Sequence, residues 1–489
     1  MTRRGLAAIA IGLALLSGKP SAGPAADQDI PLKQDLDKIF SDPVLARALI
    51  GVRVDSLATG ETLYQANANK LVVPASNMKL LTMSVAAAKL GWDFTFETRL
   101  EAAGSITGGV LKGDLVVVGG GDPSIVSQDF GPAPLFLEWA DALARAGVHR
   151  VEGRLIGDDN AFDDDGLGAG WAWDYLTDSY AAPTGALSYN ENNAIVRVWP
   201  GKVAGDPARI EVSPPGSLLD VINETKTGEA KGTTSLTLLR MPGSSRLTVR
   251  GSVPSDGKVT TRTTTVDNPT RFFVEGLRLA LAERGITISD GAWDIDDVKE
   301  APVAAGRRLM AKRVSPPLTV IGGYFLKPSQ NFYGETILKT LGRVAGGAGT
   351  AAAGRRVVHD TLVSWGIPTD AFVMNDGSGL SRYDYVTADT IVAILTRMWK
   401  DPAMRGPFTA LLPVAGHDGT LDTRMKGTVL DGHVLAKTGT ISNVRSLSGY
   451  LETKSGERLV FSMIANHFTA ASAAVDAVVE RALARLAAR

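Results

Sequence analysis

The spacing of apolar positions changes twice along the chain and so divides it into three parts. In the first part, strand-like alternation over 44–54 and 61–64 gives way to helical spacing over 77–90, and Gly91 stops the helix. The last part mixes both periods. It predicts helices at 331–343, 354–365, 387–399 and 470–488, and strands at 433–437, 447–452 and 459–464.

The middle part, 94–303, has a β-rich pattern. Short alternating stretches are separated by turns rich in Gly, Pro and Asp, and a few helices intervene. The expected strands include 111–118, 194–198 and 247–253, and the expected helices include 134–146 and 270–284. The simplest architecture is one α/β domain made from both ends of the chain, 27–93 and 304–489, with 94–303 inserted between them.

The first 26 residues have the pattern of an export signal. Arg3 and Arg4 form a positive region, 5–16 an apolar core and 17–26 a zone of small residues, with cleavage expected between Ala22 and Ala26. A membrane anchor is the alternative, but an apolar core of about 12 residues is too short to span a bilayer. We therefore predict an exported protein whose mature chain has no transmembrane segment.

Composition narrows the range of functions. The 51 basic residues nearly balance the 52 acidic ones and form no basic cluster, so nothing suggests a nucleic-acid partner. The absence of cysteine excludes disulfides, a thiol nucleophile and an iron–sulfur cluster. The five histidines are scattered without ligand spacing, so we predict no metal site and no cofactor.

Three short motifs follow one another along the chain. They are Ser76-Asn77-Met78-Lys79, Ser329-Gln330-Asn331 and Lys437-Thr438-Gly439-Thr440. Together they provide what acyl transfer without histidine requires: a serine nucleophile, a lysine base, a polar relay and an electropositive strand edge. Ser76 and Lys79 stand three residues apart on a predicted helix, so their side chains share a face. Each motif alone is common, but the ordered trio is a specific signal.

A second copy of each motif lies in the insertion and serves as a control for chance matches. Ser255 and Lys258 have the Ser-x-x-Lys spacing, but Ser255 stands in a Pro-Ser-Asp-Gly turn that does not hold the two side chains on one face. Lys226 opens a Lys-Thr-Gly in a polar stretch without a strand pattern, and Ser188 opens a Ser-x-Asn. These copies also stand in the wrong order, so we expect them to have no catalytic role.

With these motifs the chain resembles the class C low-molecular-mass penicillin-binding proteins, which are serine D-alanyl-D-alanine carboxypeptidases and endopeptidases of the DacB type. The resemblance covers nearly the whole mature chain. It includes the segments 74–79, 120–124, 375–382, 412–421 and 436–440. Two positions depart from the family pattern: Asp384 stands where Asn is expected, and Gln330 stands where Asp is commoner.

The resemblance implies an α/β (α+β) fold with a transpeptidase/β-lactamase-like catalytic domain, in which helices cover both faces of an antiparallel sheet. Two inserted domains would separate the first motif from the second. The implied substrates are peptidoglycan stem peptides ending in D-Ala-D-Ala, and the implied inhibitors are β-lactams, which would acylate the serine. The implied location is the periplasm or another extracytoplasmic cell-wall space of a bacterium. Carboxypeptidase activity and cross-link endopeptidase activity both fit.

The resemblance implies three catalytic residues. Ser76 would attack the carbonyl between two D-alanines, and Lys79, as a neutral amine, would accept the serine proton. Ser329 would relay a proton to the departing D-alanine. Because these groups lie outside 94–303, we expect the catalytic domain to react with a small β-lactam even without the insertion.

The remaining motif residues are expected to bind the substrate. Asn331 would orient the peptide amide, while Lys437 would attract the terminal carboxylate and lower the pKa of the base. Thr438 and Thr440 would hydrogen-bond the carboxylate, and the backbone N–H groups of the nucleophile and Thr440 would form the oxyanion hole. Gly439 would leave room for substrate backbone beside the strand edge.

Three other functions stay open at this point. They are a Ser-x-x-Lys β-lactamase or esterase, a non-catalytic wall-binding or β-lactam-sensing protein, and an unrelated structural protein with chance motifs. A β-lactamase or esterase seldom carries an insertion of this size, and a binding protein would lack one of the chemical side chains. An assay of β-lactam acylation and release would separate them.

Overall fold

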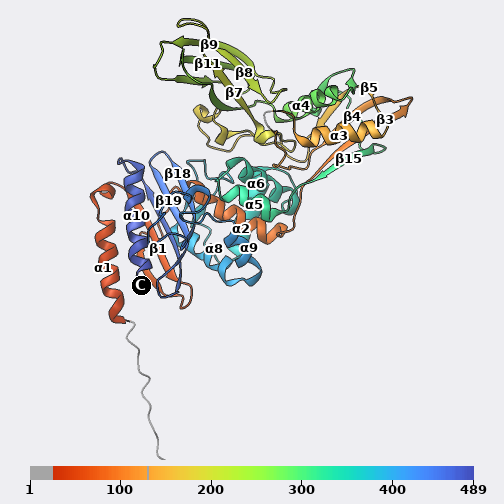
Figure 1. Cartoon of the computed structure of the whole chain (residues 1–489). Coiled ribbons are helices and arrows are strands. Elements are labelled where there is room, and N and C mark those ends of the chain that lie inside the picture. The colour runs from red at the N-terminus through yellow and green to blue at the C-terminus, as the bar shows by residue number, and fades with distance from the viewer. Residues whose placement is uncertain (1–25, 129–130) are drawn as a thin grey trace, which may run out of the picture.

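A computed structural model describes residues 26–128 and 131–489 of the chain (Figure 1). The predicted export signal lies outside the described residues, except for its last position. None of the described helices combines the length and the apolar character that crossing a membrane requires.

A five-stranded antiparallel sheet, called the main sheet below, joins the two ends of the chain (Figure 1). Its strand order is β18-β19-β20-β1-β2. The strands are β1 (Leu49–Ser56), β2 (Thr62–Ala66), β18 (Val434–Ile441), β19 (Val444–Glu452) and β20 (Arg458–Asn466). Because β1 pairs with β20 along its full length, the N-terminal hairpin completes a sheet built mainly from C-terminal residues.

Alternate residues of the main sheet face two separate cores, since successive side chains of a strand point to opposite faces. Leu459, Phe461 and Met463 of β20 pack in the core that contains α1 (Ala26–Phe40) and α10 (Ser472–Ala487). Val460 and Ile464 pack in the opposite core. The helices of that core are α2 (Met78–Leu90), α5 (Leu318–Leu326), α6 (Asn331–Ala345), α7 (Ala351–Ser364), α8 (Ala388–Lys400) and α9 (Pro402–Ala410). The prediction of an antiparallel sheet with helices on both faces is confirmed.

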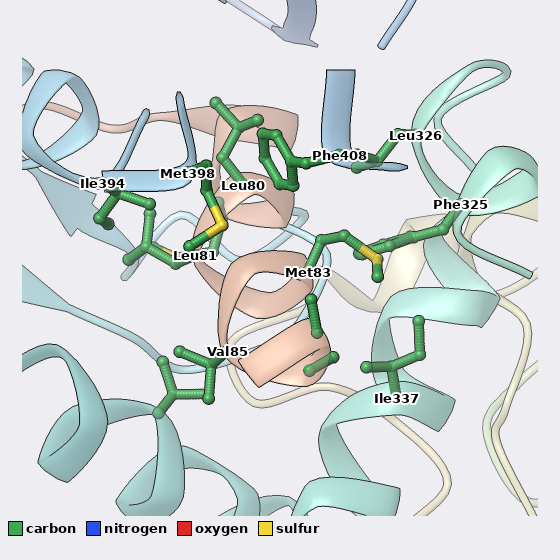
Figure 2. Close-up of a cluster of buried hydrophobic side chains, with 14 of the residues drawn as sticks. Leu80, Leu81, Met83, Val85, Phe325, Leu326, Ile337, Ile394, Met398 and Phe408 are labelled. Atoms are coloured by element: carbon green, nitrogen blue, oxygen red, sulfur yellow. The ribbon is translucent and has the colours of Figure 1, made fainter. Parts of the chain in front are cut away.

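Helix α2 lies inside the second core (Figure 2). Its residues from Met78 to Ala87 are all buried, and it ends at Gly91, whose φ of 82° favours glycine. Apolar side chains from neighbouring helices surround it. They are Phe325 and Leu326 of α5, Ile337 of α6, Ile394 and Met398 of α8, and Phe408 of α9. A helix that is buried on every side has little freedom to shift, so the residues at its start are held firmly.

Leu81→Ala is expected to lower the free energy of unfolding by about 3 kcal/mol, because it leaves a cavity in the packing around α2. Urea denaturation followed by tryptophan fluorescence measures the change. Leu71→Ala is the matched control, since Leu71 is exposed, and it should change the free energy of unfolding by less than about 0.5 kcal/mol. Equal losses in the two variants would contradict this account of the core.

Residues 97–314 form three further sheets beside the main-sheet domain (Figure 1). The largest has the order β13-β5-β4-β3-β15, with β6 and β14 attached beside β4. Its strands are β3 (Glu97–Thr107), β4 (Val110–Val118), β5 (Arg150–Glu152), β6 (Leu155–Asp158), β13 (Thr287–Ile288), β14 (Ala292–Asp294) and β15 (Arg308–Val314). Helices α3 (Pro134–Arg145) and α4 (Pro269–Glu283) contact each other and share its apolar core.

The other two sheets have three strands each, in the orders β12-β7-β8 and β10-β11-β9. Their strands are β7 (Asn193–Trp199), β8 (Arg209–Ser213), β9 (Asp220–Gly228), β10 (Ser235–Leu239), β11 (Arg246–Pro254) and β12 (Thr260–Thr265). The two sheets share a small core of their own. A short ribbon of β16 (Phe372–Val373) and β17 (Tyr385–Val386) lies instead with the main-sheet domain.

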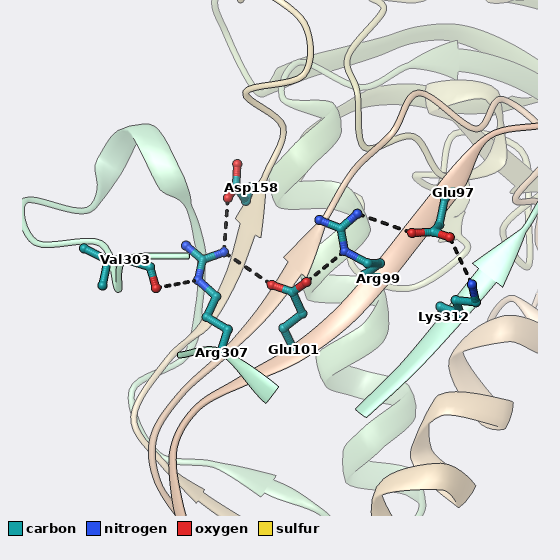
Figure 3. A network of polar contacts seen from close by, with 7 residues as sticks. All are labelled: Glu97, Arg99, Glu101, Asp158, Val303, Arg307 and Lys312. Atoms are coloured by element: carbon teal, nitrogen blue, oxygen red, sulfur yellow. Dashed lines mark hydrogen bonds and ion pairs between the residues drawn. The ribbon is translucent and has the colours of Figure 1, made fainter. Parts of the chain in front are cut away.

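A network of charged side chains ties the end of the insertion to its beginning (Figure 3). Lys312 of β15 contacts Glu97 of β3 at 3.1 Å, and Arg307 contacts Glu101 of β3 at 3.7 Å. Both cations follow residue 303, and β15 pairs with β3 as far as Val314. The predicted division at 303 stays a prediction, and this pairing favours a limit nearer to 314.

Several elements were not expected from the sequence. They include helices α1, α5 and α9, and strand β9, which contains Lys226 despite its polar pattern. β9 lies at the edge of its sheet, pairs only with β11 and is largely exposed, so it can be a strand without alternating apolar residues. Ser255 follows β11 in a turn, as predicted.

Candidate active site

The first motif stands where a tight turn runs into α2. Ser76 is the middle residue of a 3-10 turn, Ala75–Asn77, which continues directly into the helix. The Lys79 Nζ atom donates a hydrogen bond to the Ser76 Oγ atom at 2.9 Å. The predicted shared face of the two side chains is therefore present, with the serine half-buried and the lysine fully buried.

The environment of Lys79 favours the neutral amine. Its Nζ atom also donates hydrogen bonds to Asn331 Oδ1 at 2.6 Å and to the Ser378 backbone oxygen at 2.7 Å. Burial lowers the pKa of Lys79 to about 7, although the carboxylates of Asp376, Glu335 and Asp384 act in the opposite direction. Near neutral pH a substantial fraction of this lysine is therefore able to accept a proton.

Two of the carboxyl groups near Lys79 are themselves disfavoured as anions. Burial raises the pKa of Glu335 to about 8 and raises the pKa of Asp384 well above its usual value, with Asp376 adding repulsion to both. Asp384 Oδ1 accepts a hydrogen bond from the backbone N–H of Asn375 at 2.6 Å. The amide oxygen of an asparagine could accept the same bond, which explains why Asp can replace the expected Asn here.

The second and third motifs meet through Lys437. Its Nζ atom donates hydrogen bonds to Ser329 Oγ at 2.8 Å and to the Thr438 backbone oxygen at 2.9 Å. The Lys437 backbone oxygen accepts a bond from Asn77 Nδ2 at 2.9 Å, which ties β18 to the turn of the nucleophile. Burial, and then repulsion from Lys79, holds the pKa of Lys437 well below its usual value.

Gly439 is small for a different reason from the one predicted. A Cβ atom at this position would lie 2.1 Å from Ser446 Oγ, 2.7 Å from the Pro74 backbone oxygen and 3.1 Å from the Ser76 nitrogen. The space is thus occupied by the protein's own atoms, and glycine allows the nucleophile turn to lie directly against β18.

A cavity of about 540 Å³ opens over the three motifs. Five of the predicted site residues line it: Ser76, Ser329, Asn331, Thr438 and Thr440. The other three do not line it: Lys79 and Lys437 are fully buried, and Gly439 lies in the strand against the nucleophile turn. None of the second motif copies at Ser188, Lys226 and Ser255 is among its lining residues.

Sequence reasoning missed several residues of this site. Tyr175, Tyr180, Thr420 and Ser442 also line the cavity, and Thr420 Oγ1 lies 2.7 Å from Thr438 Oγ1. The two tyrosines belong to the insertion, where a group of aromatic residues in a turn-rich stretch was the available signal. Thr420 lies in a segment that carried the family resemblance, but no role had been assigned to it.

Comparisons with known proteins agree with this arrangement. The model of the D-Ala-D-Ala carboxypeptidase 3 (S13) family matches residues 32–489. A D-alanyl-D-alanine carboxypeptidase of Actinomadura sp. strain R39 is 35% identical over 484 residues, which cover 95% of this chain and 87% of the relative.

Solved structures agree on the fold. Penicillin binding protein 4 (dacB) of Haemophilus influenzae superposes with a TM-score of 0.81 at 22% identity, covering 92% of this chain and 98% of the other. The same protein in complex with a β-lactam superposes with a TM-score of 0.76 at 22% identity, covering 93% and 98%. The predicted family, fold class and peptidase activity are confirmed. The chain thus belongs to the D-Ala-D-Ala carboxypeptidase 3 (S13) family.

Proposed function

We propose that the protein hydrolyses the D-Ala–D-Ala bond of peptidoglycan stem peptides through an acyl-enzyme on Ser76. The observation that carries this assignment is the 2.9 Å hydrogen bond between Ser76 and a buried lysine whose pKa is lowered to about 7. A lysine that is neutral near pH 7 can act as a general base, and the serine beside it lies at the wall of the cavity.

Acylation begins when Lys79 takes the hydroxyl proton and Ser76 Oγ attacks the carbonyl carbon. The oxyanion that forms is stabilised by the backbone N–H groups of Ser76 and Thr440, each worth about 3 kcal/mol in comparable sites. The close approach of the Ser76 nitrogen to Gly439, the neighbour of Thr440, supports this pairing. The scissile C–N bond then breaks.

The leaving D-alanine departs as an amine and therefore needs a proton. Ser329 supplies it from its hydroxyl, and Lys437, which donates to Ser329 Oγ at 2.8 Å, replaces it. Water then attacks the ester carbon and passes a proton back along this route, while Lys79 returns its proton to the Ser76 oxygen. The net result is hydrolysis of one peptide bond.

The remaining polar groups hold the substrate. Asn331, which is fixed by its bond from Lys79, orients the peptide amide. The hydroxyls of Thr438 and Thr440 bind the terminal carboxylate, and Thr420 orients the Thr438 hydroxyl. A carboxylate placed beside Lys437 favours the protonated form of its amine, so binding of the substrate increases the positive charge on Lys437.

The location of the protein and its reaction with β-lactams follow from the same assignment. The family acts on the cell wall, so the protein works outside the cytoplasm, and residues 1–26 serve as its export signal into the periplasm or an equivalent space. β-Lactams acylate Ser76 because they present a strained amide in place of the D-Ala–D-Ala bond. The β-lactam complex of the Haemophilus protein supports this.

Two measurements test the proposal. Purified uncross-linked muropeptides should release terminal D-alanine, and purified cross-linked muropeptides should be cleaved at the cross-link. The ratio of these two rates gives the balance of carboxypeptidase and endopeptidase activity. A β-lactam should label the protein and be released slowly. Fast release without cleavage of D-Ala-D-Ala would indicate a β-lactamase, and absence of acylation would indicate a binding protein.

Lys437→Ala should raise KM for substrates with a free C-terminal carboxylate by about 30-fold or more, because it removes the buried partner of that charge. KM for substrates whose carboxylate is amidated should rise much less, whereas kcat should fall for both substrates, because Lys437 also replaces the proton of Ser329. Steady-state kinetics on the paired substrates measures the difference. Lys226→Ala, in the second Lys-Thr-Gly, is the matched control and should behave like the wild type. An equal rise of KM for the free and the amidated substrate would contradict the proposed contact between Lys437 and the substrate carboxylate.

A further inference from the structure

The insertion contacts the second motif directly. Gln330 Nε2 donates a hydrogen bond to Glu191 Oε2 at 2.6 Å, and the next residue, Asn331, donates from its Nδ2 atom to the Tyr180 backbone oxygen at 2.9 Å. Glu191 and Tyr180 both lie within 94–303. Two successive residues of the motif are therefore held by a part of the chain that the sequence assigned to a separate module.

The motif needs to be held because its backbone is strained. Ser329 has a φ of 65°, a left-handed conformation that a serine adopts only when its surroundings impose it. Its hydroxyl is fixed by the bond from Lys437. Gln330 is the next residue, and its side-chain bond to Glu191 fixes the other end of the strained unit.

Glu191 is itself held in an unusual conformation. Asn190, Glu191 and Asn192 have φ values of 53°, 53° and 54°, and glutamate, unlike asparagine, rarely adopts this region. The flanking asparagines stabilise the turn: Asn190 Nδ2 donates to the Asn193 backbone oxygen at 2.7 Å and Asn192 Nδ2 to the Pro183 backbone oxygen at 2.8 Å. Strain concentrated on a side chain that points at the catalytic motif suggests a functional constraint.

The carboxylate of Glu191 is engaged by Gln330. The side chain is half-buried, and burial raises its pKa while the hydrogen bond from Gln330 lowers it. Gln330 is also one of the two positions where this chain departs from the family pattern. An aspartate there would place a second carboxylate against Glu191, whereas the amide of glutamine can donate to it.

We propose that Glu191 is a positioning residue for acyl transfer, which acts through Gln330 to hold Ser329 and Asn331 in their reactive geometry. This inference rests on the proposed function. It makes the insertion a structural part of the active site. A catalytic domain without the insertion would still contain every reacting group and should still react with a small β-lactam, but more slowly, because Ser329 and Asn331 would lose the contacts that position them.

A double-mutant cycle tests the proposal. Gln330→Glu places two carboxylates in contact and should lower the acylation rate constant with a fluorescent penicillin by about 100-fold, as expected when a reacting group is displaced by about 1 Å. Adding Glu191→Gln restores a donor–acceptor pair of reversed polarity and should return the rate to within about tenfold of the wild type. Glu191→Gln alone completes the cycle: its amide oxygen can still accept from Gln330, so its loss of rate should be smaller than that of Gln330→Glu.

The rate is expressed per labelled molecule at saturation, so a smaller folded fraction does not lower it. Glu224→Gln, at an exposed position of the insertion, is the control and should match the wild type. If Gln330→Glu keeps the wild-type rate, or if the second substitution fails to restore it, the role of Glu191 is overturned. Labelling that survives Ser76→Ala would instead overturn the acyl-enzyme itself.

Discussion

Ser76→Ala should abolish both cleavage of D-Ala-D-Ala peptides and covalent labelling by penicillin. The substitution removes the oxygen that forms the ester, and losses of about 10⁴-fold or more are usual when a serine nucleophile is deleted. The fold should survive, since a single half-buried hydroxyl contributes little to the free energy of unfolding. Labelling is measured by mass spectrometry of the intact protein, and cleavage by release of D-alanine.

Ser255→Ala is the matched control for this prediction, because Ser255 begins the second Ser-x-x-Lys in a turn of the insertion. It should be labelled and should cleave peptides at the wild-type rate. Penicillin labelling that persists in the Ser76 variant and disappears in the Ser255 variant would refute the assignment of the nucleophile.

Lys79→Ala should lower the acylation rate constant by about 10²- to 10⁴-fold, the usual effect of removing a general base. The variant also leaves the buried Asn331 and Ser378 oxygens without their donor, which costs about 1–3 kcal/mol of the free energy of unfolding. Thermal unfolding must therefore be measured beside the rate. Lys258→Ala, the lysine of the second Ser-x-x-Lys, should change neither quantity.

The pH profile distinguishes loss of a base from loss of structure. The amine of Lys79 must be unprotonated to act, and its pKa is about 7, so the wild-type acylation rate should rise with pH and reach half its plateau near pH 7. The small residual rate of Lys79→Ala should lack this rise. A variant that keeps the same profile at a lower amplitude would show that another group is the base.

The sequence was informative wherever a function depends on local pattern. Apolar residues at helical spacing placed Ser76 at the start of α2, and a short apolar run placed Lys437 on a strand. Because the i, i+3 spacing fixes the geometry within a helix, the Ser76–Lys79 contact could also be predicted. The faces of the main sheet followed from the family resemblance rather than from periodicity alone.

Contacts between distant segments could not be predicted in this way. The sequence around Glu191 does not predict its contact with Gln330, because the periodicity of a helix or strand relates only residues that are close together in the chain. The lowered pKa of Lys79 was predicted from shielding and from the charge of Lys437 together. Burial of Lys79 is the main cause in the structure, and the extent of that burial depends on contacts between distant segments.

The strand order of the main sheet also limits the order in which the catalytic domain can assemble. β1 and β2 are made first, but β1 has no second neighbour until β20, near the C-terminus, has emerged. A two-stranded hairpin is only marginally stable alone, and pairing across such a long loop is slow. The insertion together with β15 can fold earlier, since in the described residues the strands from β3 to β15 pair only with one another. The catalytic domain is therefore completed only when its last strand, β20, has paired with β1.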